Sequence, residues 1–235
     1  HMNYVESIGM SMCGVVQNNQ VGRVGNLGID SFDFVSLFHR DFPTAKLYFA
    51  NDANCSALVE AEYGANKGFL NSAFVTISTG IGLGVVHNGE MIDLPLEGGR
   101  MFVNYKGMNY EAEYLLSGNG IVHLAALNNI EINSAYEFFQ SIRAKDEKMI
   151  ALYHIWIDML ATWFSNLQLL FNVDSYAVSG GVMKSKDIFF EDLERLANEK
   201  IAAWNFKPIV LKYASFTQDV GLAGGGALAW HALKK

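Results

Sequence analysis

Short apolar segments alternate with helical segments along almost the whole chain, and this alternation limits the possible folds more than any other feature. Apolar runs typical of strands are found at 5–12, 45–50, 73–78, 83–87, 175–179 and 208–213. Helical spacing or helix-start signals are found at 31–42, 51–64, 189–201 and 220–232, and residues 121–171 are mostly helical. Strands that alternate with helices indicate an α/β fold. The long helical stretch among them suggests two lobes with a cleft between them.

Composition excludes several classes of protein. Hydrophobic residues make up 51% of the chain and charged residues 17%, which argues against disorder. The formal net charge is −7 and lysines and arginines are not clustered, so we expect no direct binding to nucleic acid or to an anionic membrane. The longest apolar helix candidate, 149–171, is interrupted by polar residues and does not read as a membrane span. Cys13 and Cys55 are most simply free thiols in a reducing compartment, so we expect a cytoplasmic protein.

The glycine-rich stretch Thr79-Gly80-Ile81-Gly82-Leu83-Gly84 lies between two apolar runs. It is compatible with a tight turn between two strands. It is equally compatible with a loop whose backbone N–H groups converge on an anion, because three glycines exceed what a turn needs.

A second motif, Asn51-Asp52, stands where a strand-like run meets a helix. Both residue types are favoured helix N-caps, and in isolation that is the simpler interpretation. The alternative is a carboxylate at the carboxyl end of a strand, where ligand sites of α/β proteins lie and where it could accept a proton from a substrate hydroxyl. Gly180-Gly181 after a strand is either a strand-to-helix turn or a place where the backbone approaches a nucleotide. The charged residues Glu97, Arg100 and Glu113 in the irregular segment 94–117 are either solvated surface or, for the carboxylates, acceptors of hydrogen bonds from sugar hydroxyls. The run "GLAGGGALA" is interpreted as a tight helix-packing surface.

The order of these motifs is more specific than any one of them. A strand–NDAN–helix, a strand–TGIG–strand, a helical insert and a strand–GG–helix resemble the ROK family of sugar kinases and sugar-responsive repressors. The resemblance implies an actin-like (ribonuclease H-like) ATPase fold with two lobes and a cleft. In this chain the first lobe would be truncated at its N-terminus, with 3–50 as its remnant. Residues 51–235 would form the larger C-terminal α/β lobe, with a helical insert at about 114–172.

The resemblance also implies site residues. Asp52 would be the general base that deprotonates the sugar hydroxyl, with Asn26, Asn51, Glu97, Arg100 and Glu113 as further sugar-binding residues. Glu111 is the alternative to Glu113 if the register slips by two. Thr79, Gly80, Gly82, Gly180 and Gly181 would bind the nucleotide. The implied reaction is phosphoryl transfer from ATP with Mg²⁺ to a hexose or N-acetylhexosamine. A homodimer is expected by resemblance only.

Two departures from the family pattern change these expectations. The family's structural zinc needs one His and three Cys, but Arg100 stands at the His position and no cysteine lies between residues 98 and 113. We therefore predict no zinc, and Arg100 would suit an anionic or carbonyl-bearing group. The family also begins with a D-x-G-G-T strand and hairpin, which this sequence lacks. We therefore expect weak or absent kinase activity and an unpaired edge on the strand 8–12.

Three functions remain open at this point. The first is a sugar-kinase-like protein that binds a hexose or N-acetylhexosamine. The second is the sugar-sensing effector domain of a ROK-type transcriptional regulator, since regulators of this kind often keep the same motifs. The third is a degenerate paralogue that retains the fold for dimerisation.

Overall fold

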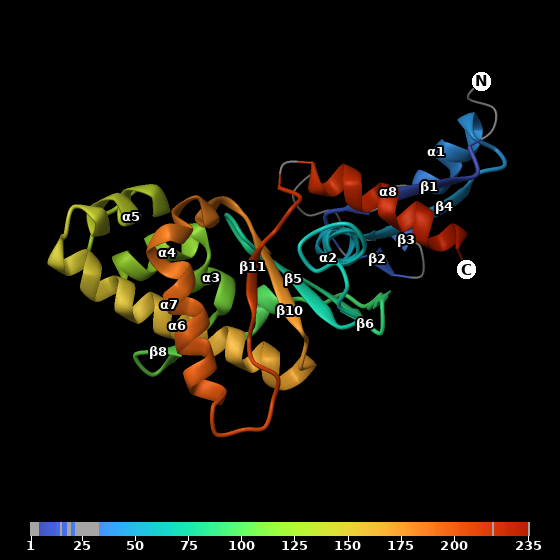
Figure 1. Ribbon diagram of the computed structural model, residues 1–235. Coiled ribbons are helices and arrows are strands. Elements are labelled where there is room, and N and C mark those ends of the chain that lie inside the picture. The colour runs from blue at the N-terminus through green and yellow to red at the C-terminus, as the bar shows by residue number, and fades with distance from the viewer. Residues whose placement is uncertain (1–4, 15, 18–19, 22–32, 218, 235) are drawn as a thin grey trace. The chain divides into compact units, whose positions relative to one another are not determined.

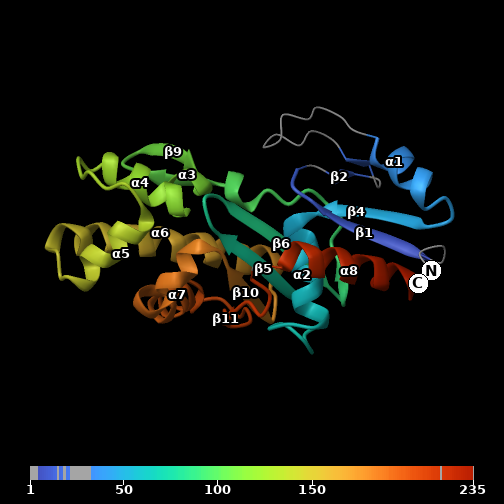
Figure 2. The same ribbon diagram turned by 90° about the horizontal axis from the view of Figure 1, so that it is seen from above.

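The computed structural model describes residues 5–14, 16–17, 20–21, 33–217 and 219–234. These residues form two compact units, shown in Figure 1 and Figure 2. The first unit contains residues 1–74, 84–96 and 214–235, and the second contains residues 75–83 and 97–213. Two of the four unit boundaries fall within strands β5 (Ser72–Ile77) and β6 (Ile81–His87).

The first unit is built on two parallel strands. β1 (Ser7–Met12) pairs with β4 (Lys46–Asn51), with Ser7 opposite Lys46 and Met12 opposite Asn51. Within the described residues β4 is the one strand that pairs with β1, so β1 is an edge strand there. The other elements of this unit are β2 (Val16–Gln17), β3 (Gln20–Val21), α1 (Phe34–Asp41), α2 (Asp52–Glu62), β7 (Glu90–Met91) and α8 (Val220–Leu233).

Helix α8 packs against β1 and α2 through its glycines, and Figure 2 shows it running along β1 and β4. A Cβ added to Gly225 would lie 2.7 Å from the Gly9 carbonyl oxygen, and one added to Gly224 would lie 2.8 Å from the Cβ of Cys55. Only residues without side chains allow this approach. The interpretation of the glycine run as a packing surface is therefore confirmed.

A five-stranded sheet has the order β11-β10-β5-β6-β7. β10 (Ser175–Ser179) pairs in parallel with β11 (Leu211–Tyr213), and β6 pairs antiparallel with β7. The turn between β6 and β7 is Asn88-Gly89, with φ of 53° and 78°, as the sequence predicted. This turn is also tied to the loop before β5, because the Asn88 N–H donates to the Asn71 side chain at 3.0 Å.

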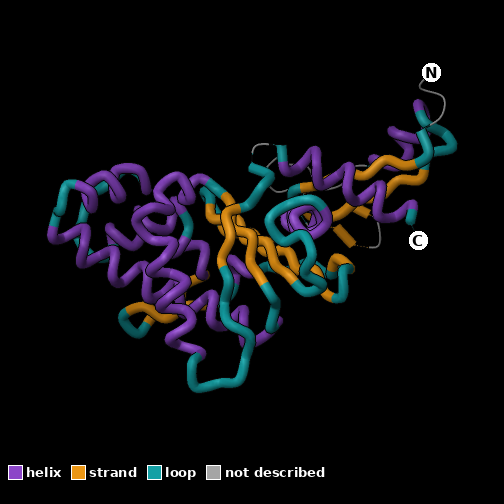
Figure 3. Tube along the Cα trace, in the orientation of Figure 1, coloured by secondary structure: helices purple, strands orange, loops and turns teal. Residues whose placement is uncertain are grey.

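Helices make up most of the second unit, as the purple segments of Figure 3 show. They are α3 (Ala112–Leu116), α4 (Gly118–Ala126), α5 (Ala135–Arg143), α6 (Glu147–Phe171) and α7 (Lys186–Ile201), with 3₁₀ turns η3 (Gly98–Arg100) and η4 (Gly181–Ser185). The core of this unit is aromatic. The Trp156 ring packs edge-to-face with those of Phe139 and Phe189, with ring centroids 5.7 Å and 5.3 Å apart. All three side chains are buried. Burial of rings this large is a main source of stability.

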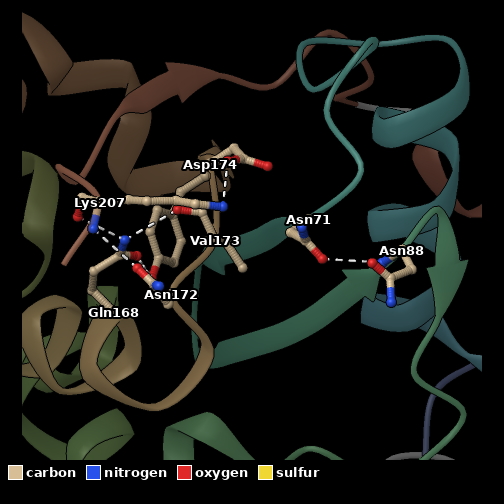
Figure 4. A network of polar contacts seen from close by, with 8 residues as sticks. Asn71, Asn88, Gln168, Asn172, Val173, Asp174 and Lys207 are labelled. Carbon is tan, nitrogen blue, oxygen red and sulfur yellow. Dashed lines mark hydrogen bonds and ion pairs between the residues drawn. The ribbon is translucent and has the colours of Figure 1, made fainter.

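The C-terminal end of α6 is closed by polar contacts, drawn in Figure 4. Asn172 adopts the left-handed conformation that ends many helices, and its side chain accepts from the Lys207 N–H at 3.0 Å. The Gln168 amide donates to the Val173 and Lys207 carbonyls, and the Lys207 ammonium pairs with Asp174 at 2.6 Å. These bonds hold the residues that follow the helix, together with Lys207, against its C-terminal end.

One segment expected to be irregular is regular in the structure. Residues 102–111 form a hairpin of β8 (Phe102–Tyr105) and β9 (Met108–Glu111). Its turn is Lys106-Gly107, with φ of 50° and 80°. Lysine is uncommon in this conformation, so the sequence carries a weaker turn signal here than at Asn88-Gly89.

Candidate functional site

Helix α2 starts at Asn51-Asp52, and the two residues have different roles there. Asn51 is the N-cap: its side-chain oxygen accepts from the Ala53 N–H at 2.9 Å and the Asn54 N–H at 3.4 Å. Its amide nitrogen donates to the Gly14 carbonyl at 3.1 Å, which leaves one amide N–H for another partner. Because Asn51 caps the helix, the carboxylate of Asp52 is not needed for that purpose.

The Asp52 side chain lies at the surface in the first turn of α2. Partial loss of solvent around the carboxylate raises its pKa above the ordinary aspartate value. A hydrogen bond from the Ala53 N–H to Oδ1, 2.9 Å long, opposes this shift. A raised pKa makes the ionised form a stronger base, which suits a residue that must take a proton from a hydroxyl.

The glycine-rich stretch is a turn, and it is also fastened from two directions. The Ser78 N–H donates to the Gly80 carbonyl at 2.8 Å within the turn. The Gly118 N–H donates to the Ser78 carbonyl at 2.7 Å. The Ile81 N–H donates to Oε2 of Glu113 at 2.9 Å. A Cβ added to Gly80 would lie 2.3 Å from that same oxygen, so the loop needs glycine where Glu113 contacts it.

Glu111 and Glu113 were alternatives in the sequence, and the structure gives them different partners. Glu113 lies in α3 with its carboxylate on the glycine-rich turn. Glu111, at the end of β9, forms an ion pair with Arg100. One oxygen of Glu113 holds the turn, and a carboxylate has acceptor capacity to spare on its other oxygen.

Glu97 and Arg100 flank a turn that packs on β6. A Cβ on Gly99 would lie 2.6 Å from the Ile81 carbonyl oxygen, and a Cβ on Gly98 would lie 2.9 Å from the Cβ of Leu83. The hydrogen bond to Glu111, with the charges of Glu111, Glu113 and Glu97, raises the pKa of Arg100 further above its ordinary value. The charge of Arg100 is thus surrounded by carboxylates, which reduces its ability to attract an anionic sugar.

A pocket of about 350 Å³ in the second unit contains part of the expected nucleotide site. It brings together Thr79 and Gly181 from the sequence-predicted set. Its remaining lining residues are Ser78, Gly118, Asn119, Val122, Asn133, Ser134, Ala135, Tyr136 and Val182. Sequence reasoning missed Asn119, Asn133 and Tyr136, because each is an isolated polar or aromatic residue at the start of a helix.

Gly180 stands directly before η4 in a conformation that favours glycine, with φ of 105°. A Cβ there would lie 2.2 Å from the Ile77 carbonyl oxygen, whereas the space around Gly181 is open for 4 Å. Gly180 therefore lets η4 approach β5, and the open space beside Gly181 belongs to the pocket.

Zinc does not fit the segment that would hold it. Arg100 cannot coordinate a metal in its charged form, and no cysteine lies between residues 98 and 113. Across the described residues, no three His, Cys, Asp or Glu side chains are grouped so that they could hold a metal ion. Among the same described residues, no helix has both the length and the apolar character needed to cross a bilayer. Asn26 lies outside the described residues.

Comparison with known proteins identifies the family. The model of the ROK family matches residues 1–232. A fructokinase of Pediococcus pentosaceus is 28% identical over 218 residues, which is 88% of this chain and 72% of the fructokinase. Two other curated relatives are matched over 60% and 64% of their own length.

Solved structures show the same fold. The ROK hexokinase from Thermus thermophilus matches with a TM-score of 0.85 and 24% identity, over 97% of this chain and 80% of that one. A ROK family transcriptional regulator, a homologue of the E. coli MLC protein, matches with a TM-score of 0.80 and 19% identity, over 97% of this chain and 63% of that one. The fold is therefore that of the ROK kinases, with their actin-like ATPase architecture, as the sequence predicted. Because the ROK family model matches residues 1–232 and the fold is shared with these proteins, the chain belongs to the ROK family.

Proposed function

We propose that this chain binds a hexose or N-acetylhexosamine and that its ancestral activity is ATP-dependent phosphorylation of that sugar. The observation that carries the proposal is the contact between Glu113 and the glycine-rich turn. It couples a carboxylate assigned to the sugar with a backbone loop assigned to the phosphoryl group. Such coupling is useful in phosphoryl transfer, where catalysis depends mainly on positioning and on charge stabilisation.

Each proposed role follows from the chemistry of its residue. Asp52 accepts the proton of the attacking hydroxyl, and its raised pKa supports that role. Asn51 holds Asp52 at the start of α2 and offers its remaining amide N–H to the sugar. Glu97 and the free oxygen of Glu113 accept hydrogen bonds from sugar hydroxyls. The other proposed sugar contacts are Asn26 and Arg100.

The nucleotide is assigned to the second unit. Thr79, Gly80 and Gly82 would hold the transferred phosphoryl group through backbone N–H groups, and Gly180 and Gly181 would lie against the adenosine. The pocket beside Thr79 and Gly181 supports this assignment, because its volume suits a small ligand. Magnesium would enter with the phosphates of ATP and supply charge neutralisation. We also propose a homodimer without a metal of its own.

The sugar-sensing effector domain of a transcriptional regulator is the second candidate. It is suggested by the fold that the chain shares with a ROK family regulator. A hexokinase and a regulator share this fold, so the fold is compatible with both functions. Turnover distinguishes the two functions, because an effector domain needs to bind the sugar but not to phosphorylate it.

Release of ADP in the presence of ATP, Mg²⁺ and a panel of hexoses and N-acetylhexosamines tests the proposal. Sugar-dependent ADP release that is lost in Asp52→Asn supports a kinase. Sugar binding by calorimetry without ADP release supports the effector domain. Absence of both binding and turnover for every sugar contradicts the proposed function.

A further inference from the structure

The β8–β9 hairpin precedes Glu113 in the chain and has little support of its own. An isolated two-stranded hairpin is marginally stable in water. Within this one, the Asn104 amide donates to the Asn109 oxygen across the strands at 3.0 Å. Phe102 and Met108 are more than 60% exposed, and none of its apolar side chains is fully buried. Something outside the hairpin must hold it.

At the end of the hairpin near α3, Tyr110 stacks on Tyr114 and Glu111 pairs with Arg100. Asn128, just after the C-terminal end of α4, supports the end with the turn. Its side-chain oxygen accepts from the Tyr105 hydroxyl at 2.8 Å and from the Lys106 ammonium at 3.0 Å. Its amide nitrogen donates back to the Leu124 carbonyl at 2.8 Å, which fixes the orientation of the side chain. Lys106 also donates to the Leu127 carbonyl at 3.2 Å. A cation is favourable at this end of a helix.

These contacts close the segment 102–128 into a ring that holds the glycine-rich turn. From the hairpin, the chain passes into α3, where the Ala112 N–H donates to the Met101 carbonyl at 2.7 Å. The next residue, Glu113, holds the Ile81 N–H. On the other side of the turn, Ser78 is held by the first residue of α4, Gly118. Helix α4 then leads to Asn128, which bonds back to the hairpin, so the segment 102–128 closes on itself and carries both residues that hold the turn, Glu113 and Gly118, in its middle.

We propose that Asn128 is a positioning residue that closes this ring, so that the hairpin holds the Glu113 carboxylate on the glycine-rich turn without a metal ion. The donors that would hold zinc in this segment do not fit, as Arg100 and the missing cysteines show. Side-chain hydrogen bonds to Asn128 fix the segment here. The ring itself is a property of the structure, whereas its benefit to sugar binding rests on the proposed function.

Amide hydrogen exchange at Ile81 is the direct test, because this N–H donates to Glu113. Asn128→Ala removes the acceptor of two hydrogen bonds, and we expect exchange at Ile81 to accelerate by about tenfold or more. Asn128→Asp keeps the acceptor and should recover most of the protection. Asn104→Ala is the matched control: it removes one hydrogen bond from the same hairpin but none to α4, so Ile81 should exchange as in the wild type.

Unchanged exchange at Ile81 in Asn128→Ala would overturn the proposal, even if the variant melts at a lower temperature. Stoichiometric zinc in the purified protein, with a fall in Tm on adding EDTA, would overturn its metal-free part. We expect neither zinc nor an effect of EDTA. If exchange responds as expected but no sugar binds the wild type, the ring stands and the proposed function fails.

Discussion

Oε2 of Glu113 accepts the Ile81 N–H at 2.9 Å across 32 residues of sequence, so a single carboxylate fastens the glycine-rich turn to α3. The same oxygen occupies the space that a side chain at position 80 would need. A hydrogen bond to a charged acceptor contributes roughly 1.5–3 kcal/mol. This contact is therefore a substantial part of what fixes the turn.

Gly80→Ala and Glu113→Ala should show non-additive effects on the free energy of unfolding. In the wild-type background the new methyl group meets Glu113, whereas in the Glu113→Ala background that obstacle is gone. We expect a coupling energy of at least about 0.5 kcal/mol between the two positions, measured by urea unfolding of the four proteins. Strict additivity would show that the two residues do not meet.

Asp52→Asn should lower any turnover and at the same time stabilise the protein at neutral pH. A raised pKa means that the folded state holds the proton more tightly than the unfolded state does. The ionised carboxylate therefore costs stability above its folded pKa, and this cost disappears as the pH falls through that value. We expect the Tm advantage of the variant to shrink on acidification, and any phosphorylation rate to fall by about 10²–10⁴-fold.

Asp41→Asn is the charge-matched control for that experiment. Its hydrogen bond with Arg40 lowers the pKa of Asp41, so the sign is reversed and neutralisation should not stabilise the protein. A Tm gain at pH 7 in both variants would point to net charge as the cause. If Asp52→Asn gives no gain in Tm at pH 7, the account of the Asp52 carboxylate is contradicted.

The glycines of helix α8 give a second matched pair. Gly225→Ala places a methyl group 2.7 Å from the Gly9 carbonyl, and overpacking of this kind costs about 1–3 kcal/mol. Gly226 has open space around it, so Gly226→Ala should be neutral or stabilise the helix by up to about 1 kcal/mol. Thermal or urea unfolding distinguishes them, and equal effects would contradict the packing described.

The two thiols should differ in reactivity. Burial raises the pKa of Cys55 to about 12, whereas Cys13 is half-buried. A thiol that stays protonated is a poor nucleophile. In the native protein an aromatic disulfide reagent should modify Cys13 and spare Cys55 until urea is added. Cys13→Ser should remove the native reaction, and a Cys55 that reacts at the native rate of Cys13 would contradict its burial.

Local signals in the sequence predicted most of the fold. The start of α2 follows from Asn51, and the turn after β6 follows from Asn88-Gly89, because capping and turn formation depend on neighbouring residues. The hairpin at Lys106-Gly107 was missed. The hairpin is held by Asn128, which lies more than twenty residues away in the sequence, and no short-range pattern predicts such a contact.

The candidate site could be predicted only as a set of residue types. The order of the motifs predicted Glu113 and the glycine-rich turn as separate elements, but it did not predict the hydrogen bond between them. The expectation that Arg100 would suit an anionic group did not take its ion pair with Glu111 into account. That pair depends on the register of β8 with β9, which the sequence does not reveal. Asn119, Asn133 and Tyr136 enter the pocket only once the helices fold.

Calorimetric titration of the wild-type chain with glucose, fructose, mannose, N-acetylglucosamine and N-acetylmannosamine tests the central claim most directly. We predict saturable binding of at least one of these sugars, weakened by about tenfold or more in Glu113→Ala, because a charged hydrogen-bond partner is lost. Absence of heat from every sugar, or binding that Glu113→Ala leaves unchanged, would contradict the account.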